Sequence, residues 1–270
     1  MAVIELNAVS VRHPATAANG PPPLRELNLA IAAGEQVAVI GASGAGKTTF
    51  LHLLASALRP DAGDFKLFGS DPWLLSETAR HALRARLFLA PQVPPLPPRQ
   101  RVVTAVLAGC LPQWGLWQSI VSLVKPRDAE AAYHALARFD LQDKLYKRVD
   151  RLSGGERQRC GMARLVLSNA ELLLVDEPLS ALDPTLSRQT LTALLQEAAQ
   201  RQATLICSLH HVAFARAYFP RIIGLREGRV MFDVPREQVT DAMVEALYQN
   251  ERPGEVPGLD PRRALEPRGF

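Results

Sequence analysis

Cysteine is scarce in this 270-residue chain, and the three that occur, Cys110, Cys160 and Cys207, lie far apart inside apolar segments. A disulfide framework or a zinc site needs closely spaced pairs such as CxxC, and the sequence contains none. The cysteine pattern therefore argues against both. We expect buried free thiols, as in proteins of a reducing compartment.

Long apolar runs and a secretory leader are also missing. No window reaches the roughly 20 apolar residues of a membrane-spanning helix, and the nearest, LWQSIVSLV at 116–124, is far too short. The opening MAVIELNAVSVRHP lacks the basic head and apolar run of a signal peptide. We expect a cytosolic chain, or one that reaches a membrane through its partners.

A strong excess of one charge is absent as well. The chain has 31 Lys and Arg against 27 Asp and Glu, and the net charge of +4 is spread along its length. A dispersed surplus is typical of a solvated surface, so we expect no nucleic-acid partner. The segment from Arg252 differs, since it is rich in proline and arginine and predicts a loosely ordered tail.

What the sequence does contain is an alternation of apolar strands and amphipathic helices. Apolar runs predict strands at 3–11, 27–31, 36–40, 87–90, 172–177 and 204–209, and a hairpin at 221–233. Helical periodicity predicts helices at 48–58, 102–111, 128–140 and 190–200. This order predicts an α/β core around a parallel sheet with a helical insertion.

The same pattern predicts that the chain divides into three parts. Residues 1–92 and 160–235 are expected to form the core with an N-terminal β subdomain, and residues 93–159 a helical subdomain that opens on the proline-dense VPPLPPRQ. Residues 236–270 are expected to form a C-terminal helix and tail.

The segment GASGAGKTT at 41–49 fits the pattern G-x-x-x-x-G-K-[ST] between a predicted strand and a predicted helix. Glycines let successive backbone N–H groups point at an anion, and the helix adds its positive N-terminus. Lys47 is placed to reach β- and γ-phosphates and Thr48 to bind Mg²⁺. We predict a nucleotide site here, with contacts from Gly41, Ser43, Gly44, Ala45, Gly46, Lys47, Thr48 and Thr49.

Two acidic residues follow the predicted buried strand LLLV, and they narrow the possible classes of nucleotide-binding protein. In parallel α/β sheets the carboxyl ends of strands face the ligand, so Asp176 and Glu177 are expected near the phosphate loop. Asp176 is suited to the Mg²⁺ shell, and Glu177 to orienting or deprotonating the attacking water. Such a pair alone is more often a helix start or a solvated loop; the phosphate loop favours the functional interpretation.

A second glycine-rich segment, LSGGERQR at 152–159, precedes a helix about twenty residues before Asp176. Ser153, Gly154 and Gly155 offer a hydroxyl and N–H donors at a helix N-terminus, which predicts another anion site. With this segment the sequence resembles the ATP-binding-cassette ATPases, whose LSGGQ signature it matches except at Glu156. The resemblance extends to about residue 235.

The resemblance implies a P-loop NTPase (RecA-like) fold with an antiparallel N-terminal β subdomain and an α-helical insertion. It also implies ATP and Mg²⁺ as ligands, and a head-to-tail pair of subunits in which each signature closes on the γ-phosphate held by the partner's phosphate loop.

Other family positions are placed residue by residue. Gln92 resembles the Q-loop glutamine that touches Mg²⁺ and the attacking water, and His210 resembles the switch histidine of the γ-phosphate. His211 is the alternative, but the family's alanine five residues later matches Ala215 only if His210 is the switch. Residues 180–183 resemble the D-loop, which crosses the dimer interface and ends at Asp183.

Two positions depart from the family pattern. His13 stands where an aromatic residue usually stacks on adenine, and an imidazole offers less stacking area. Glu156 adds a negative charge beside a phosphate site, which is tolerable only if the carboxylate points away from the nucleotide.

A finer resemblance is to phosphonate importer ATPases, through VLAGCLP (106–112), SLHHV (208–212) and the segment 219–233 with VTDAMVEALY after it. It implies a motor subunit at the cytoplasmic face of the inner membrane, paired with a second copy and an integral membrane permease, and served indirectly by a periplasmic binding protein. The alternatives are a soluble ATPase of a phosphonate-metabolising complex, a regulator, or a motor for export or another substrate.

Overall fold

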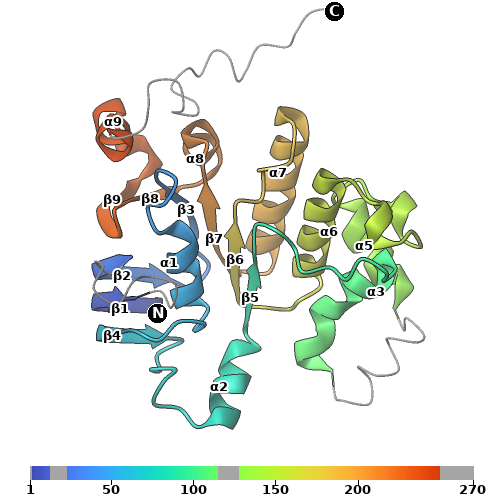
Figure 1. The fold of residues 1–270 in the computed structure, drawn as a ribbon, viewed down its shortest axis with the longest axis horizontal. Helices are drawn as coiled ribbons and strands as arrows, with labels where there is room; N and C mark the ends of the chain where they lie inside the picture. The colour runs from blue at the N-terminus through green and yellow to red at the C-terminus, as the bar shows by residue number, and fades with distance from the viewer. Residues whose placement is uncertain (1, 13–22, 115–127, 250–270) are drawn as a thin grey trace, which may run out of the picture.

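The computed structural model describes residues 2–12, 23–114 and 128–249. Within them the chain folds into two sheets (Figure 1). A three-stranded antiparallel sheet has the order β2-β1-β4, and a six-stranded sheet has the order β5-β6-β7-β3-β8-β9. In the larger sheet β9 alone runs antiparallel to its neighbour. The predicted fold class, a parallel core with an antiparallel N-terminal sheet and helices beside it, is confirmed.

The strands and helices have the following bounds. The small sheet consists of β1 (Ala2–Val11), β2 (Leu24–Ala32) and β4 (Ala62–Leu67). The large sheet consists of β3 (Gln36–Ile40), β5 (Leu87–Ala90), β6 (Leu172–Asp176), β7 (Thr204–Leu209), β8 (Arg221–Arg226) and β9 (Arg229–Pro235). The helices are α1 (Lys47–Leu54), α2 (Glu77–Arg84), α3 (Val102–Leu107), α5 (Ala129–Ala137), α6 (Gly154–Val166), α7 (Pro184–Gln200), α8 (Val212–Tyr218) and α9 (Asp241–Tyr248).

The central strands are continuous apolar runs because both faces of the sheet are covered. Every residue of β6 and β7 is buried. Side chains along a strand point alternately to opposite faces, and in β3 Ala38 and Ile40 enter one core cluster while Val37 and Val39 enter the other. The first cluster lies under α3 and α5–α8, the second under α1 and the small sheet. This two-sided burial is the reason that the sequence predicted these strands well.

Two elements between α1 and β5 were not predicted from the sequence. The strand β4, AGDFKL, has four exposed residues and only Phe65 and Leu67 buried, so its pattern is too polar to indicate a strand. The helix α2 buries Leu83 alone, and its start is fixed by Ser76, whose hydroxyl accepts a hydrogen bond from the Ala79 N–H. The predicted helix at 102–111 is present as α3 followed by a 3₁₀ helix, Ala108–Gln113, which contains Pro112.

None of the helices in the described part of the chain is both long and apolar enough to cross a membrane. The predicted tail and the residues of LWQSIVSLV lie outside the described residues, so those predictions stay predictions. The predicted division at 93–159 also stays a prediction; α6 runs across position 159 without a break.

The three cysteines are free thiols. Burial raises the pKa of Cys160 to about 12 against a smaller lowering effect of the Arg164 charge, and burial raises the pKa of Cys207 well above its usual value. Cys110 is part-buried and its thiol pKa is also raised, by burial and then by the charge of Asp128.

Because the thiolate is the reactive form, we expect Cys160 and Cys207 not to react with a disulfide reagent in the folded protein. Cys110 should react more slowly than a free thiol. Titration with Ellman's reagent should show three reactive thiols after unfolding in guanidinium chloride. Reaction of Cys160 or Cys207 in the folded protein, located by mass spectrometry of the modified peptides, would contradict the burial described here.

Candidate active site

The loop of residues 41–46 connects β3 to α1 at the carboxyl end of the parallel strands. Gly46 takes φ +102° directly before the helix, a conformation that disfavours any residue with a Cβ. At Gly41 the reason for glycine is close approach, because a Cβ there would lie 2.1 Å from the Leu225 carbonyl oxygen. The Ala45 carbonyl accepts a hydrogen bond of 3.0 Å from the Gly228 N–H, so the β8–β9 turn holds the loop from outside.

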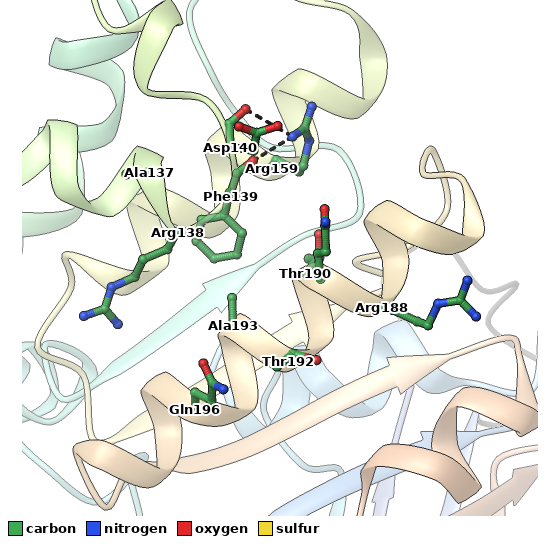
Figure 2. A pocket seen from close by; sticks show the side chains of 11 residues that line it. Ala137, Arg138, Phe139, Asp140, Arg159, Arg188, Thr190, Thr192, Ala193 and Gln196 are labelled. Carbon is green, nitrogen blue, oxygen red and sulfur yellow. Dashed lines mark hydrogen bonds between the residues drawn. The ribbon is translucent and has the colours of Figure 1, made fainter.

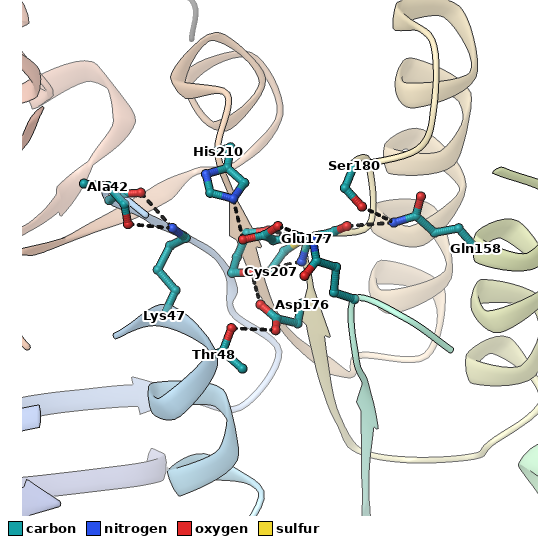
Figure 3. Close-up of polar contacts among 12 residues, drawn as sticks. Ala42, Lys47, Thr48, Gln158, Asp176, Glu177, Ser180, Cys207 and His210 are labelled. Carbon is teal, nitrogen blue, oxygen red and sulfur yellow. Dashed lines mark hydrogen bonds and ion pairs between the residues drawn. The ribbon is translucent and has the colours of Figure 1, made fainter. Parts of the chain in front are cut away.

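Lys47 is buried although it carries a charge. Its Nζ donates to the carbonyl oxygens of Gly41, at 2.8 Å, and Ala42, at 3.0 Å (Figure 3). The ammonium is thus held over the glycine loop by the loop's own backbone. The first N–H groups of a helix have no partner within the helix, so at α1 this cation lies beside a set of N–H donors. A cation beside such donors is suited to bind a phosphate chain, as the sequence predicts.

Asp176 is buried at the end of β6 and is held by hydroxyl groups on both sides. Thr48 Oγ1 donates to Asp176 Oδ2 at 2.8 Å, and Ser208 Oγ donates to Oδ1 at 2.6 Å. The predicted pair Thr48 and Asp176 is therefore brought together. Ser208 was missed from the sequence; it lies opposite Asp176 in the parallel register of β6 and β7, and only that register identifies it.

Glu177 is the meeting point of two of the predicted catalytic side chains. Its Oε1 lies 2.5 Å from His210 Nε2, and its Oε2 accepts a hydrogen bond of 2.8 Å from Gln92 Nε2 (Figure 3). The Glu177 backbone has φ +47°, uncommon for a residue with a Cβ. Its N–H is fixed by a 3.0 Å hydrogen bond to Ser208 Oγ. The strained backbone and the two side-chain partners fix the direction of the carboxylate.

The electrostatics of Glu177 keep it ionised. Burial raises the pKa of its carboxyl group, but the hydrogen bond and charge of His210, with the charge of Lys47, outweigh burial, and the net effect lowers the pKa. Beside it, burial and then the His210 charge lower the pKa of His211. A cavity of about 280 Å³ lined by Gln92, Glu177, His210 and neighbouring residues opens at this point. An ionised carboxylate facing such a cavity is suited to act on a water molecule.

Ser153 begins α6 and is joined to Glu156 by a reciprocal pair of hydrogen bonds. Ser153 Oγ accepts from the Glu156 N–H at 3.2 Å, and Glu156 Oε2 accepts from the Ser153 N–H at 2.7 Å. The other carboxylate oxygen of Glu156 lies 3.5 Å from Lys144 Nζ. The Ser153 and Lys144 contacts lower the pKa of Glu156 against a raising effect of burial. The sequence left open where this carboxylate points. In the structure it points to the N-terminus of α6, where it accepts the hydrogen bond from the Ser153 N–H.

The signature residues and the phosphate loop do not meet within one chain. Figure 1 shows α1 and α6 well apart, with strands of the large sheet between them. Asp183 is the N-cap of α7, accepting from the N–H groups of Thr185 at 2.8 Å and Leu186 at 3.0 Å. The predicted role of Asp183 at a nucleotide stays a prediction. His13, predicted to stack on adenine, lies outside the described residues.

A cavity of about 560 Å³ lies elsewhere, between the end of α5 and α7, and contains none of the predicted site residues. Its arginines do not converge: Figure 2 shows the guanidinium groups of Arg138 and Arg188 pointing away from one another. Arg159 donates to the carbonyl oxygen of Phe139 at 2.6 Å and so closes the end of α5. This cavity lacks the convergent polar groups of a ligand site.

The fold and these residues define a class of protein. A phosphate loop with an acid pair at the end of β6, a histidine after β7 and a separate glycine-rich start of α6 are the parts of an ATP-binding-cassette ATPase. The sequence profile of the family described as ABC transporter matches residues 24–180, more than half of the chain. The chain belongs to this family.

Curated relatives are similar over nearly the whole length. The phosphonates import ATP-binding protein PhnC 2 of Albidiferax ferrireducens is 60% identical over 91% of this chain and 88% of its own. The protein named PhnC of Polaromonas sp. is 59% identical over the same shares of the two chains.

Solved structures agree on the fold. An ATP-binding cassette described as a dimer in a post-hydrolysis state with ADP and Pi has a TM-score of 0.75 at 22% identity, covering 86% of this chain and 98% of that one. The chain cbiO1 of Clostridium perfringens, described as part of the ABC transporter complex cbiONQ, has a TM-score of 0.73 at 20% identity, covering 92% of this chain and 95% of that one.

Proposed function

We propose that the chain is the ATP-hydrolysing motor subunit of a bacterial importer for phosphonates or related phosphorus oxyanions. The observation that carries this proposal is the 60% identity, over 91% of the chain, to a protein named as a phosphonates import ATP-binding protein. The site supports it, because Lys47, Asp176 and Glu177 lie together as ATP hydrolysis requires. Two copies pair head to tail, at the cytoplasmic face of the inner membrane, on an integral membrane permease.

The donor set fits Mg²⁺, which prefers oxygen ligands. The Thr48 hydroxyl and the Asp176 carboxylate lie 2.8 Å apart, and Ser208 fixes the carboxylate from its other side. We assign Thr48 and Asp176 to the ion, with the Gln92 side-chain oxygen as a further ligand. When bound, Mg²⁺ neutralises charge on the β- and γ-phosphate oxygens.

We propose a hydrolytic step that the geometry of Glu177 supports. Its carboxylate orients a water molecule and accepts a proton from it as the water oxygen attacks the γ-phosphorus and the bond to the ADP oxygen breaks. Lys47 and the loop N–H groups hold the phosphates, and Ser153 with Gly154 and Gly155 of the partner copy closes on the γ-phosphate. His210, now paired with Glu177, turns its Nε2 donor to the γ-phosphate when ATP binds.

A pH experiment examines the pairing of Glu177 with His210. In His210→Gln the carboxyl group keeps the burial that raises its pKa and loses the partner that lowers it. The ionised form is the base, and kcat/KM for ATP reports the free protein, in which His210 still faces Glu177. The acid limb of the residual kcat/KM should therefore move to higher pH. Rate profiles from about pH 5 to pH 8 would measure this, with His134→Gln, on the exposed surface of α5, as the matched control. An acid limb that stays in place would contradict the assignment.

The transported substrate, and the coupling of ATP hydrolysis to its transport, are tested by an experiment in membranes. We expect the tagged chain to be recovered from solubilised membranes with an integral membrane permease, and proteoliposomes of that complex to accumulate labelled methylphosphonate only with ATP and a periplasmic binding protein. Glu177→Gln in the same complex should abolish uptake. Recovery of a purely soluble complex would overturn the importer proposal, and uptake of phosphate or phosphite in place of methylphosphonate would reassign the cargo.

A further inference from the structure

Gln158, in the second turn of α6, makes three hydrogen bonds to a single loop. Its Nε2 donates to the Glu177 carbonyl oxygen at 2.7 Å and to Ser180 Oγ at 3.1 Å (Figure 3). Its Oε1 accepts from the Ala181 N–H at 3.1 Å. The side chain is buried, with 3% of the residue's surface exposed. Both ends of the amide are thus used on the segment between Glu177 and α7.

That segment begins at a strained backbone position of the active site. Glu177 has φ +47°, and within the segment its carbonyl oxygen receives only a long 3.4 Å hydrogen bond, from the Ser180 N–H. The shorter bond from Gln158 is therefore the stronger restraint on the peptide unit that follows Glu177. Losing it would leave a part-buried carbonyl oxygen poorly satisfied at a strained position, where small shifts redirect the carboxylate.

The start of α6 is packed tightly against the same loop. A Cβ on Gly155 would lie 2.8 Å from the Ala181 carbonyl oxygen. Ser153, the N-cap of this helix, is five residues before Gln158, so Ser153, Gly155 and Gln158 belong to one rigid element. A displacement of the helix start must move the Gln158 amide and, through it, the loop that carries Glu177.

We propose that Gln158 is a positioning residue that links the two ATP sites of a dimer. When Ser153–Gly155 of a subunit engage the γ-phosphate held by the partner, the movement of α6 sets, through Gln158, the Glu177 carboxylate of that subunit's own site. Each catalytic carboxylate is then aligned only after the other nucleotide is in place. The inference rests on the proposed function, since it requires two copies with ATP between them.

A heterodimer with one live site shows whether Gln158 acts on Glu177 of its own subunit or on the signature that closes the partner's site. One subunit carries Glu177→Gln and cannot hydrolyse ATP; the other keeps Glu177 and is live. Gln158→Met, which keeps the approximate shape and removes the hydrogen bonds, is placed either in the live subunit or in the inactive one. Two affinity tags isolate each heterodimer. Gln36→Met in the live subunit is the matched control, because the Gln36 amide also donates to a carbonyl oxygen, that of Leu195, at 3.0 Å.

We expect Gln158→Met to lower kcat roughly 10- to 100-fold when it is in the live subunit, with KM for ATP changed less than about twofold, because an alignment contact is lost and the phosphate contacts are kept. In the inactive subunit the same substitution should leave kcat near that of the unsubstituted heterodimer, which also shows that the variant folds and pairs.

The proposal would be overturned if activity were lost in both arrangements, or only when the substitution is in the inactive subunit. Either result would mean that Gln158 maintains the conformation of the signature segment instead of positioning Glu177. Unchanged activity in both would also overturn it. Failure of the two-subunit ATPase on which the inference rests has a different result, since the heterodimer without Gln158→Met would then not form or not hydrolyse ATP.

Discussion

Glu177→Gln is expected to lower ATP hydrolysis about 10²- to 10⁴-fold, the range of a general base, and to trap two subunits with ATP between them. The amide is close in size to the carboxylate and can still contact Gln92, but it cannot accept the proton of the attacking water. The phosphate contacts of Lys47 and Thr48 are untouched, so ATP binds and stays. Size-exclusion chromatography with light scattering would detect the dimer, and phosphate release would measure turnover.

The matched control for this variant is Glu171→Gln. Glu171 pairs with Arg86 at 2.7 Å on an exposed surface, so the same chemical change there removes a salt bridge of small effect. Its turnover should stay within about twofold of the unsubstituted protein. Hydrolysis by Glu177→Gln at a comparable rate would refute the assignment of the base.

Ser153→Asp should abolish the ATP-dependent dimer and leave the fold intact. Aspartate is as good an N-cap as serine, so the hydrogen bond from the Glu156 N–H to this side chain is kept. In the dimer, however, the new carboxylate faces the partner's γ-phosphate. Two like charges about 4 Å apart at an effective dielectric constant of about 20 repel by about 4 kcal/mol, roughly 10³-fold in affinity.

The measurement is the ATP concentration that gives half-maximal dimer in the Glu177→Gln background. Ser153→Asn serves as the control, because asparagine caps a helix equally well and adds no charge. Nucleotide binding to the monomer should be the same in both variants within about twofold, since the signature is far from its own phosphate loop. Equal dimer formation by the aspartate and asparagine variants would place the signature away from the nucleotide.

The sequence predicted the parts of the fold in which local pattern and burial agree. The runs at 36–40, 172–176 and 204–209 are buried on both faces, which leaves an unmistakable apolar signal. The pattern failed at β4 and α2, where four of six residues and most of the helix are exposed. Such elements exist because neighbouring strands and helix caps hold them, and neither is visible in a local window.

The residues of the candidate site likewise fall into those that the sequence predicted and those that it did not. Thr48 was predicted from the spacing of the phosphate loop, Asp176 and Glu177 from their place after a buried apolar run, and His210 from the family resemblance. The structure brings Thr48 to Asp176 and His210 to Glu177. Ser208 and Gln158 act on the same groups but were not predicted, since each is identified only by its neighbour in space. Their contacts depend on strand register and on the packing of α6 against the loop after β6.

We propose that each ATP site is built from two chains, and subunit complementation tests this most directly. Lys47→Ala damages the phosphate loop, and Ser153→Asp damages the signature. A dimer of either variant has two damaged sites. A mixed dimer has one site with both changes and one with neither, because the intact Lys47 of one subunit meets the intact Ser153 of the other.

Each variant alone should therefore be nearly inactive, and an equal mixture should regain activity, since about half of randomly paired dimers are mixed and each has one of its two sites intact. One quarter of the unsubstituted ATPase rate is the ceiling. The link through Gln158 should keep the recovered rate roughly 10- to 100-fold below that ceiling, because the intact site faces a damaged one. A mixture that stays as inactive as its two components, although tagged subunits co-purify, would contradict the account. So would full activity of Ser153→Asp on its own.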